Sequence, residues 1–475
     1  MMSSKKRYNP ISASLFYTAG NMLIKAIPFL TLPIFTRLLT TEDFGLYNTY
    51  LSYETILTIV LGFGFVSTIR MAKVQFKDKI ENYVSSIFGL QTILAIAVDA
   101  IVFCILAFLV PNFWMSKTLI IILLVNCLST QIYNIGTAKY AINGEVAKNL
   151  IASLVLTFIN VGSSILLCLF VFSNETYLGR IVGTCFGAIV VAIIILVFQF
   201  KKSFCWHNKE YWLFGLRMGA PLIVHSLSLV ILSQSDKIMI QSLIGSSEAG
   251  IYGLAVTLAG IVTVIVSSVD NAWAPWFYDN LEKRNYSHIT RCNNYMVAAF
   301  TALVIGVLLV SPELIKIVSE RSYWDSVFSF PPLVVSVLFS FFYLIPVNFE
   351  YFHKKTVFIA ISTAITATIN IALNFVLIRF FGYIGAAYAT CASNILLFLM
   401  HWIRARNIDK VQIVSILWIL ACSLFAVGAM LLVLLFNDSV RVRYAFAAEI
   451  LGVLIIFMKH NNLFANFKTF IHKKK

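Results

Sequence analysis

The sequence predicts an all-α membrane protein that crosses the bilayer about fourteen times. Of its 475 residues, 60% are hydrophobic and only 12% are charged, whereas a soluble domain is roughly half apolar and a quarter charged. Apolar runs of about 20 residues recur along nearly the whole chain, and each is long enough to cross a hydrocarbon core of roughly 30 Å as a helix. The connections average about ten residues, so none can hold a soluble domain.

The apolar runs define the expected helices in order. They lie at residues 12–36, 45–66, 84–110, 119–141, 150–172, 181–200, 218–244, 250–273, 296–318, 333–352, 357–378, 385–402, 411–436 and 445–458. The first run is too long for the apolar core of a cleavable signal peptide and lacks a small-residue cleavage site. We therefore expect it to remain as the first helix.

Lysine and arginine, 36 residues against 21 acidic ones, are placed mainly on alternate connections. If the amino terminus is cytoplasmic, the basic groups of that side lie at residues 5–7, 70–79, 201–209, 283–291, 354–355, 404–410 and 468–475. The opposite connections carry mainly single basic residues, such as Arg180. By the positive-inside rule both termini are expected in the cytoplasm. The net charge of +15 is thus a topological signal, and no nucleic acid partner is expected.

Short sequence matches indicate an internal repeat. They pair EDFGLY at 42–47 with SEAGIY at 247–252, YLG at 177–179 with YIG at 383–385, and IN at 159–160 with IN at 369–370. Their similar spacing predicts duplication of a unit of about six helices, with the copies related by a pseudo-two-fold axis along the membrane normal. The expected domains are an N-terminal bundle at 1–210, a C-terminal bundle at 211–405, and two further helices with a basic tail at 406–475.

Several ionisable side chains fall inside the apolar runs, where a charge costs roughly 2.5 to 3.5 kcal/mol and needs a partner or a watery cavity. In the first run Asn21 and Lys25 are spaced i, i+4 and share a face. Lys25 lies midway along the run. We favour a cavity-lining Lys25 that compensates a desolvated diphosphate, against the alternative of a Lys25 paired with a carboxylate on a neighbouring helix.

The run at 218–244 carries His225, Asp236 and Lys237, and Pro221 is expected to bend it. His225 and Asp236 are separated by about three turns and therefore share a face. Asp236 and Lys237 either form a structural pair inside the bundle, or Lys237 reaches out to the lipid headgroups. His225 either titrates near neutral pH or is a hydrogen-bonded core residue.

The run at 45–66 places Tyr47, Tyr50 and Glu54 on one face, at i, i+3 and i+7. The two rings either belong to an interfacial aromatic belt or line an exit where sugar rings could stack. Glu54 lies deeper and is a candidate partner of Lys25 or an ion-coupling residue. Asp99 and Asp270 complete the set of acidic candidates, with a structural role as the alternative for Asp270.

No motif for nucleotide or metal chemistry occurs. There is no Walker A sequence, and the eight cysteines are scattered without metal-ligand spacing. We therefore expect no cofactor, no metal and no catalytic residues. A membrane glycan enzyme would need catalytic side chains in an external loop, and the only notable candidates are Arg321, Asp325, Arg441 and Arg443.

The segments PIFTRLLTTEDFGLY at 33–47 and SDKIMI at 235–240, which leads into EAGIY at 248–252, resemble the polysaccharide (O-antigen) flippases. These belong to the superfamily that also contains the multidrug and toxin extruders and the lipid II flippases. The resemblance covers essentially the full chain in helix count, topology and repeat. It implies export across the bacterial inner membrane of an oligosaccharide carried on a polyprenyl diphosphate, for O-antigen, lipopolysaccharide, capsule or exopolysaccharide synthesis, with a glycan polymerase as candidate partner.

We therefore predict a carrier in which two bundles enclose a partly cationic cavity that opens alternately to each side of the membrane. The candidate substrate-binding residues are Lys25, Asn21, His225, Lys237, Tyr47 and Tyr50. The candidates for coupling to H⁺ or Na⁺ are Asp99, Asp236, Glu54 and Asp270. The alternatives are a drug or metabolite antiporter of the same superfamily and a membrane glycan polymerase or ligase.

Overall fold

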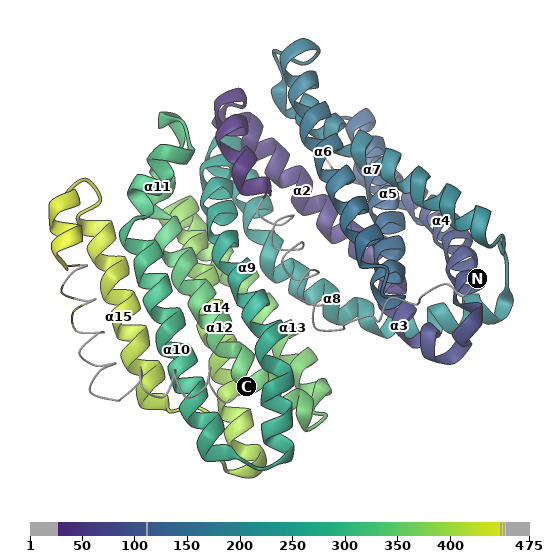
Figure 1. The fold of residues 1–475 in the computed structure, drawn as a ribbon. Coiled ribbons are helices and arrows are strands. Elements are labelled where there is room, and N and C mark those ends of the chain that lie inside the picture. The colour runs from purple at the N-terminus through teal and green to yellow at the C-terminus, as the bar shows by residue number, and fades with distance from the viewer. Residues whose placement is uncertain (1–26, 111–112, 447–448, 450–451, 453–475) are drawn as a thin grey trace, which may run out of the picture. The chain divides into compact units, whose positions relative to one another are not determined.

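The computed structural model describes residues 27–110, 113–446, 449 and 452, and these are almost entirely helical (Figure 1). No β-strand occurs among them. After a helix at Ile27–Leu38, the α-helices are α2 (Thr41–Leu61), α3 (Phe65–Phe76), α4 (Ile80–Cys104), α5 (Lys117–Ile142), α6 (Val146–Phe170), α7 (Thr176–Lys202), α8 (Lys209–Leu243), α9 (Ser246–Glu282), α10 (Tyr286–Leu309), α11 (Ser311–Val318), α12 (Phe330–Phe352), α13 (Thr356–Phe381), α14 (Tyr383–Asp409) and α15 (Ile416–Leu435).

The predicted all-α membrane fold class is confirmed. Within the described part of the chain, 10 helical segments are long and apolar enough to cross a membrane, and the bent helix α8 makes 11. The segment Thr41–Leu109 counts once in this number although it contains both α2 and α4. The total of fourteen stays a prediction, because the start of the first expected helix and most of the last lie outside the described residues.

Polar residues fix where several helices begin. Thr40 precedes α2, and its hydroxyl accepts a hydrogen bond from the Asp43 amide at 3.1 Å. Ser116 caps α5 in the same way, accepting from the Leu119 amide at 3.2 Å. Such caps satisfy amide groups that the first helical turn leaves without a partner. Thr40 and Ser116 both lie in the short connections that precede an apolar run.

The chain forms two compact units, Met1–Gly250 and Ile251–Lys475. The first unit extends past the expected boundary at 210 because α8 packs against α2, α3 and α4. As expected from Pro221, α8 is bent, by 46° between its segments Lys209–Ile223 and Ser226–Leu243. The boundaries at 210 and 405 describe the proposed duplication of the sequence, and they remain predictions.

In the first unit, α2 approaches the start of α9 backbone to backbone. A Cβ atom built on Gly45 would lie 1.7 Å from the carbonyl oxygen of Ser246, and one built on Gly250 would lie 1.9 Å from that of Thr41. The hydroxyls of Thr41 and Ser247 are 2.8 Å apart beside this contact. Only glycine permits so close an approach, so the matched motifs at 42–47 and 247–252 share a reason for their glycine.

In the second unit, α12 is the central helix and is buried over most of its length. It packs against α10, α13, α14 and α15, largely through aromatic side chains. Phe300 and Phe341 stack with ring centroids 4.0 Å apart. Two polar side chains near the end of α12, Asn348 and Glu350, are accordingly buried.

The other sequence matches fall at corresponding places in two helix hairpins, α6–α7 and α13–α14. Asn370 of α13 donates to the Ser393 hydroxyl of α14 at 3.1 Å. Asn160 of α6, with its amide turned to satisfy its donor, lies 3.2 Å from the carbonyl of Thr184 in α7. Each matched asparagine thus connects the two helices of its hairpin, which supports the predicted duplication.

Candidate functional site

An acidic cluster lies inside the first unit, where α2, α4 and α5 meet. Glu54 of α2 is partly buried, and its Oε1 accepts a hydrogen bond from the Thr130 hydroxyl of α5 at 3.0 Å. The Cys127 thiol, one turn earlier on α5, points to the Glu54 carbonyl at 3.7 Å. Cys127 is also within electrostatic range of Asp99 on α4. Glu54 and Asp99 are thus both within electrostatic range of the Cys127 thiol; we call Glu54, Asp99, Thr130 and Cys127 the acidic cluster.

The acidic cluster holds two carboxyl groups inside an apolar helical unit. One carboxylate oxygen of Asp99 is buried and has no hydrogen-bond partner among the described residues. The neighbours of Glu54 named above are neutral, and none is a lysine, arginine or histidine. Acidic groups in an apolar bundle without a basic partner favour a bound proton or cation, because either one removes the cost of buried negative charge.

Tyr50, on the same face of α2, is fully buried, and its phenol lies in electrostatic range of Glu54. Tyr47 is 8% exposed, and the Arg180 guanidinium of α7 lies 5.0 Å from its ring centroid. The same guanidinium lies 3.5 Å from the Phe35 ring centroid. In this conformation the two tyrosines line neither an open exit nor a lipid-facing belt.

A second polar group connects α2 to α8. Lys237 is 8% exposed, and its Nζ donates a hydrogen bond to Gln234 Oε1 at 2.8 Å. The same Gln234 oxygen accepts a second hydrogen bond from the Ser52 hydroxyl of α2 at 3.1 Å. Asp236 is 3% exposed, and one of its carboxylate oxygens accepts from the Lys237 amide at 2.8 Å. Lys237 is therefore held inside the unit and does not reach out to headgroups.

The remaining candidates are distributed differently. Asn21 and Lys25 lie outside the described residues, and so does the side chain of His225, although its backbone belongs to α8. Asp270 lies on α9 in the second unit, where it accepts from the Asn348 amide of α12 at 3.1 Å. The Tyr278 hydroxyl donates to Asn348 at 2.6 Å. Asp270 thus belongs to a separate hydrogen-bonded group.

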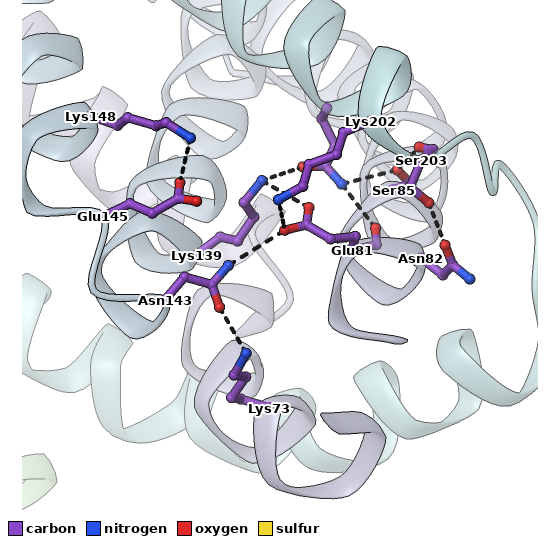
Figure 2. Close-up of polar contacts among 11 residues, drawn as sticks. Lys73, Glu81, Asn82, Ser85, Lys139, Asn143, Glu145, Lys148, Lys202 and Ser203 are labelled. Atoms are coloured by element: carbon purple, nitrogen blue, oxygen red, sulfur yellow. Dashed lines mark hydrogen bonds and ion pairs between the residues drawn. The ribbon is translucent and has the colours of Figure 1, made fainter. Parts of the chain in front are cut away.

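A basic network that the sequence analysis did not identify connects α3, α4, α5 and α7 (Figure 2). Glu81 lies between Lys139 at 3.0 Å and Lys202 at 2.6 Å, and Lys139 also donates to Gln199 at 2.7 Å. Lys73 donates to Asn143 at 3.0 Å, and Asn143 in turn lies 3.5 Å from Glu81. Two lysines share the Glu81 carboxylate, and Lys73 is connected to it only through Asn143. The network therefore keeps surplus positive charge at the end of the unit that the charge pattern predicts to be cytoplasmic.

Among the side chains considered for an external enzyme site, the structure explains the role of Arg443. Arg443 is 1% exposed; its guanidinium donates to the Leu309 carbonyl at 3.0 Å and forms two hydrogen bonds with Glu313. Burial alone would raise the pKa of the Glu313 carboxyl, but the hydrogen bonds and charge of Arg443 hold it below its ordinary value. Arg443 therefore fastens the segment after α15 to α11 and is not available to a substrate.

Comparison with known proteins places these sites in a family context. Residues 12–281 match the model of a family described as polysaccharide biosynthesis protein. The chain is 22% identical over 404 residues to "Lsg locus putative protein 1" of Haemophilus influenzae, covering 81% of this chain and 96% of that protein. It is also 22% identical over 362 residues to an uncharacterized membrane protein of the same organism, covering 73% of this chain and 85% of that protein.

Solved structures share the fold. The lipid II flippase MurJ in an inward closed conformation superimposes with a TM-score of 0.69 at 15% identity, covering 94% of this chain and 98% of that one. An inward-facing MATE-family multidrug transporter of the MOP superfamily gives a TM-score of 0.65 at 14% identity, covering 81% of this chain and 96% of that one. The likeness establishes a MurJ- and MATE-like arrangement of helices in a multi-pass membrane protein.

Proposed function

Because the chain belongs to the polysaccharide biosynthesis protein family, we propose that it is a flippase for a lipid-linked oligosaccharide. Its substrate would be a glycan repeat unit on a polyprenyl diphosphate, moved across the bacterial inner membrane by alternating access for O-antigen, capsule or exopolysaccharide synthesis. Both termini would be cytoplasmic, and a glycan polymerase would act on the exported unit.

The observation that carries this proposal is ionisable chemistry inside an apolar helical unit. The acidic cluster and the Lys237–Gln234–Ser52 group place charged side chains where a protein with only a structural role would avoid their cost. Proteins retain such residues along substrate and ion pathways. Glu54 and Asp99 are accordingly the coupling residues that we favour for H⁺ or Na⁺, with Asp236 and Asp270 as the others.

Positive charge would serve the diphosphate. The basic network of Lys73, Lys139 and Lys202 gives the expected cytoplasmic end of the first unit a surplus of cations. A lysine is a point charge well suited to phosphate oxygens. We propose that the lipid diphosphate first meets this end and is then compensated by Lys25 and Lys237, while Asn21, His225, Tyr47 and Tyr50 contact the glycan in the open conformations.

A deletion strain tests the function. Loss of a flippase should remove the exported polysaccharide from the cell surface while the lipid-linked repeat unit accumulates and stays inaccessible to a membrane-impermeant glycosidase added to spheroplasts. The wild-type gene should restore export, and Lys25→Ala should restore much less at equal membrane abundance. Full export in the deletion strain would contradict the proposal.

The same strain separates the alternatives. A polymerase or ligase would leave single repeat units exposed on the outer face of the membrane, and the surface glycan would change only in chain length or attachment. A drug antiporter would leave the glycan intact and change the resistance of the strain to cationic compounds. Either result would replace the flippase proposal.

A further inference from the structure

A pocket of about 550 Å³ lies in the second unit, where α10 and α15 begin. Its volume is within the range of small-molecule sites, roughly 300 to 1,000 Å³. One wall is the N-terminal part of α10, and the other is the connection into α15 with the first turn of that helix. The lining includes Tyr286, Ser287, Arg291, Asn294, Tyr295 and Trp418. None of these residues belongs to the sites described above.

Side chains of α10 fasten the two walls to each other. The buried Asn293 donates a hydrogen bond to the Ile413 carbonyl at 2.9 Å. Asn294 Oδ1 accepts from the Ser415 amide at 3.0 Å. These bonds satisfy backbone groups of a connection that has no helical partners for them. The pocket is therefore a fixed part of the fold, and the amide nitrogen of Asn294 is the group that this side chain can still offer to a ligand.

The lining is rich in hydrogen-bond donors and has a positive charge. Arg291 supplies the charge, and among the described residues no aspartate or glutamate lines the pocket. The hydroxyls of Tyr286, Ser287 and Tyr295 can each donate. A guanidinium with neighbouring hydroxyl and amide donors suits phosphate oxygens, which carry negative charge and accept several hydrogen bonds. The pocket therefore fits a phosphate group.

Arg291 is available to such a ligand. Its side chain is exposed, and no ion pair joins it to a carboxylate in the part of the chain that the structure describes. Ser287, Arg291 and Asn294 are spaced i, i+4 and i+7, so they share one face of α10. A phosphate that binds this face replaces water on the guanidinium and breaks no internal contact.

The pocket lies where two candidate membrane spans start. Helices α10 and α15 are both long and apolar enough to cross a membrane, and they pack against each other (Figure 1). The apolar run of α10 begins at Met296, directly after Tyr295, and Trp418 lies in the first turn of α15. Tyrosine and tryptophan are enriched at the boundary between hydrocarbon and water. The phosphate of a phospholipid lies at this same level.

Basic residues flank the pocket in the sequence. Lys283 and Arg284 precede α10, and Lys410 precedes the connection into α15. The charge pattern predicts that this side is cytoplasmic, and basic pockets between membrane helices on that side attract anionic headgroups. The ammonium of phosphatidylcholine would find no carboxylate in the described lining, whereas phosphatidylglycerol has only the negative charge. An anionic headgroup therefore fits best.

We propose that this pocket binds the phosphate of an anionic phospholipid. Arg291 pairs with the phosphate oxygens, Ser287 and Asn294 donate hydrogen bonds to them, and the Trp418 ring contacts the glycerol. The bound lipid bridges α10 and the start of α15 and stays in place, unlike a transported substrate. The site does not depend on the proposed transport. Its test uses no glycan, so failure of the lipid site and failure of the flippase proposal are distinguishable.

Photoaffinity labelling of the purified full chain in detergent tests the site. The probe is phosphatidylglycerol with a photoreactive diazirine beside its glycerol, added below saturation, and peptide mass spectrometry maps the labelled residues. In the wild type the label should fall on residues 286–295 and 412–418. Arg291→Gln should reduce this label about tenfold, because a hydrogen bond to a charged group contributes on that order to affinity. Wild-type label only at other residues, or undiminished label in the variant, would overturn the proposal.

A matched variant separates the pocket from general attraction to positive charge. Lys355→Gln removes an exposed positive charge of the same unit, in the connection between α12 and α13 and outside the lining. Its label should equal that of the wild type, and an equal loss in both variants would overturn the proposal. Both variants should melt at the wild-type temperature without added lipid, because both side chains are exposed.

Competition with the wild type identifies the source of the phosphate and decides the proposal even if Arg291→Gln does not fold. An excess of unlabelled phosphatidylglycerol should abolish the label at the pocket, while phosphatidylcholine and inorganic phosphate should leave most of it. Abolition by inorganic phosphate would assign the pocket to free phosphate and overturn the lipid assignment. Equal competition by phosphatidylcholine would overturn the preference for an anionic headgroup.

Discussion

Glu54 in the first unit and Glu350 in the second are both acidic residues of apolar helices, but among the described residues only Glu350 has a base beside it. Glu54 is partly exposed and meets the neutral hydroxyl of Thr130 at 3.0 Å, whereas Glu350 is fully enclosed with His401. An acid with neutral neighbours can take up a cation or proton without moving a helix. The enclosed pair is shielded from solvent while α12 and α14 stay packed, so the two carboxyls differ in their access to water.

The helices that carry the two acids are also held differently. Helix α2 contacts the start of α9 through backbone atoms at Gly45 and Gly250, while α12 is surrounded by large side chains such as Phe300 and Phe341. Small residues allow close and adjustable contacts between membrane helices. Interdigitated aromatic rings resist gradual displacement. The two acids therefore lie on helices whose packing contacts differ in kind.

The largest predicted effect comes from removing the base in the second unit. His401→Leu leaves Glu350 buried without its partner and should destabilise the protein by about 3 to 5 kcal/mol, measured as the largest fall in melting temperature of the series. Adding Glu350→Gln removes the uncompensated charge and should recover part of the loss. A double variant no more stable than the single one would show that the pair carries no charge.

An intermediate effect is expected at the glycine contact of the first unit. Gly45→Ala places a methyl group against the carbonyl of Ser246, and overpacking of this kind costs about 1 to 3 kcal/mol. Gly162→Ala is the matched control, because a Cβ there would have no atom within 4 Å. Fluorescence-detected gel filtration after heating compares the two variants, and equal survival would contradict the close approach.

A smaller effect is expected at the partner of Glu54. Thr130→Val keeps the shape and removes one hydrogen bond, which should cost about 1 kcal/mol, well below the effect of His401→Leu. Chemical denaturation in detergent measures the difference. If Thr130→Val destabilised the protein as much as His401→Leu, the contrast between the two acids would be lost.

The smallest effect, and one that depends on pH, is expected at Glu313. Its pKa is lowered in the folded protein from an ordinary value of 4.5, so its contribution to stability is present above that value and is lost as the pH falls through the lowered pKa. Melting temperatures of Arg443→Met and the wild type should therefore converge at acid pH, and a constant gap would contradict this assignment.

The apolar runs were sufficient to predict the fold class, because the thickness of the bilayer sets the length of a spanning helix at about 20 apolar residues. Recognising such runs needs no tertiary information. The same reasoning selected Glu54, Asp99 and Asp236 as candidates, since a carboxylate within an apolar run stands out. It missed His401 and Glu350 because each lies near the end of a run beside basic residues, where a polar side chain normally meets water. Their pairing depends on contact between α12 and α14, which no local pattern encodes.

Arg180 and Arg443 also show that tertiary contacts cannot be predicted from local sequence. Both fall in or near connections and were interpreted as boundary or external residues, yet Arg180 lies over the Phe35 ring and Arg443 is buried against Glu313. An arginine can stack on aromatic rings or form a bidentate pair with a carboxylate while its sequence neighbours are exposed. The basic network around Glu81 was missed likewise, because Lys139 and Lys202 come from helix ends distant in sequence.

Reconstitution gives the most direct test of the proposed transport. The purified full chain is inserted into liposomes with a fluorescent polyprenyl-diphosphate oligosaccharide in both leaflets, and an impermeant glycosidase is added outside. We predict that nearly all of the labelled glycan is cleaved, because the protein brings inner-leaflet substrate to the outer leaflet. Cleavage that stops at the outer-leaflet fraction, as in liposomes without protein, would contradict the account.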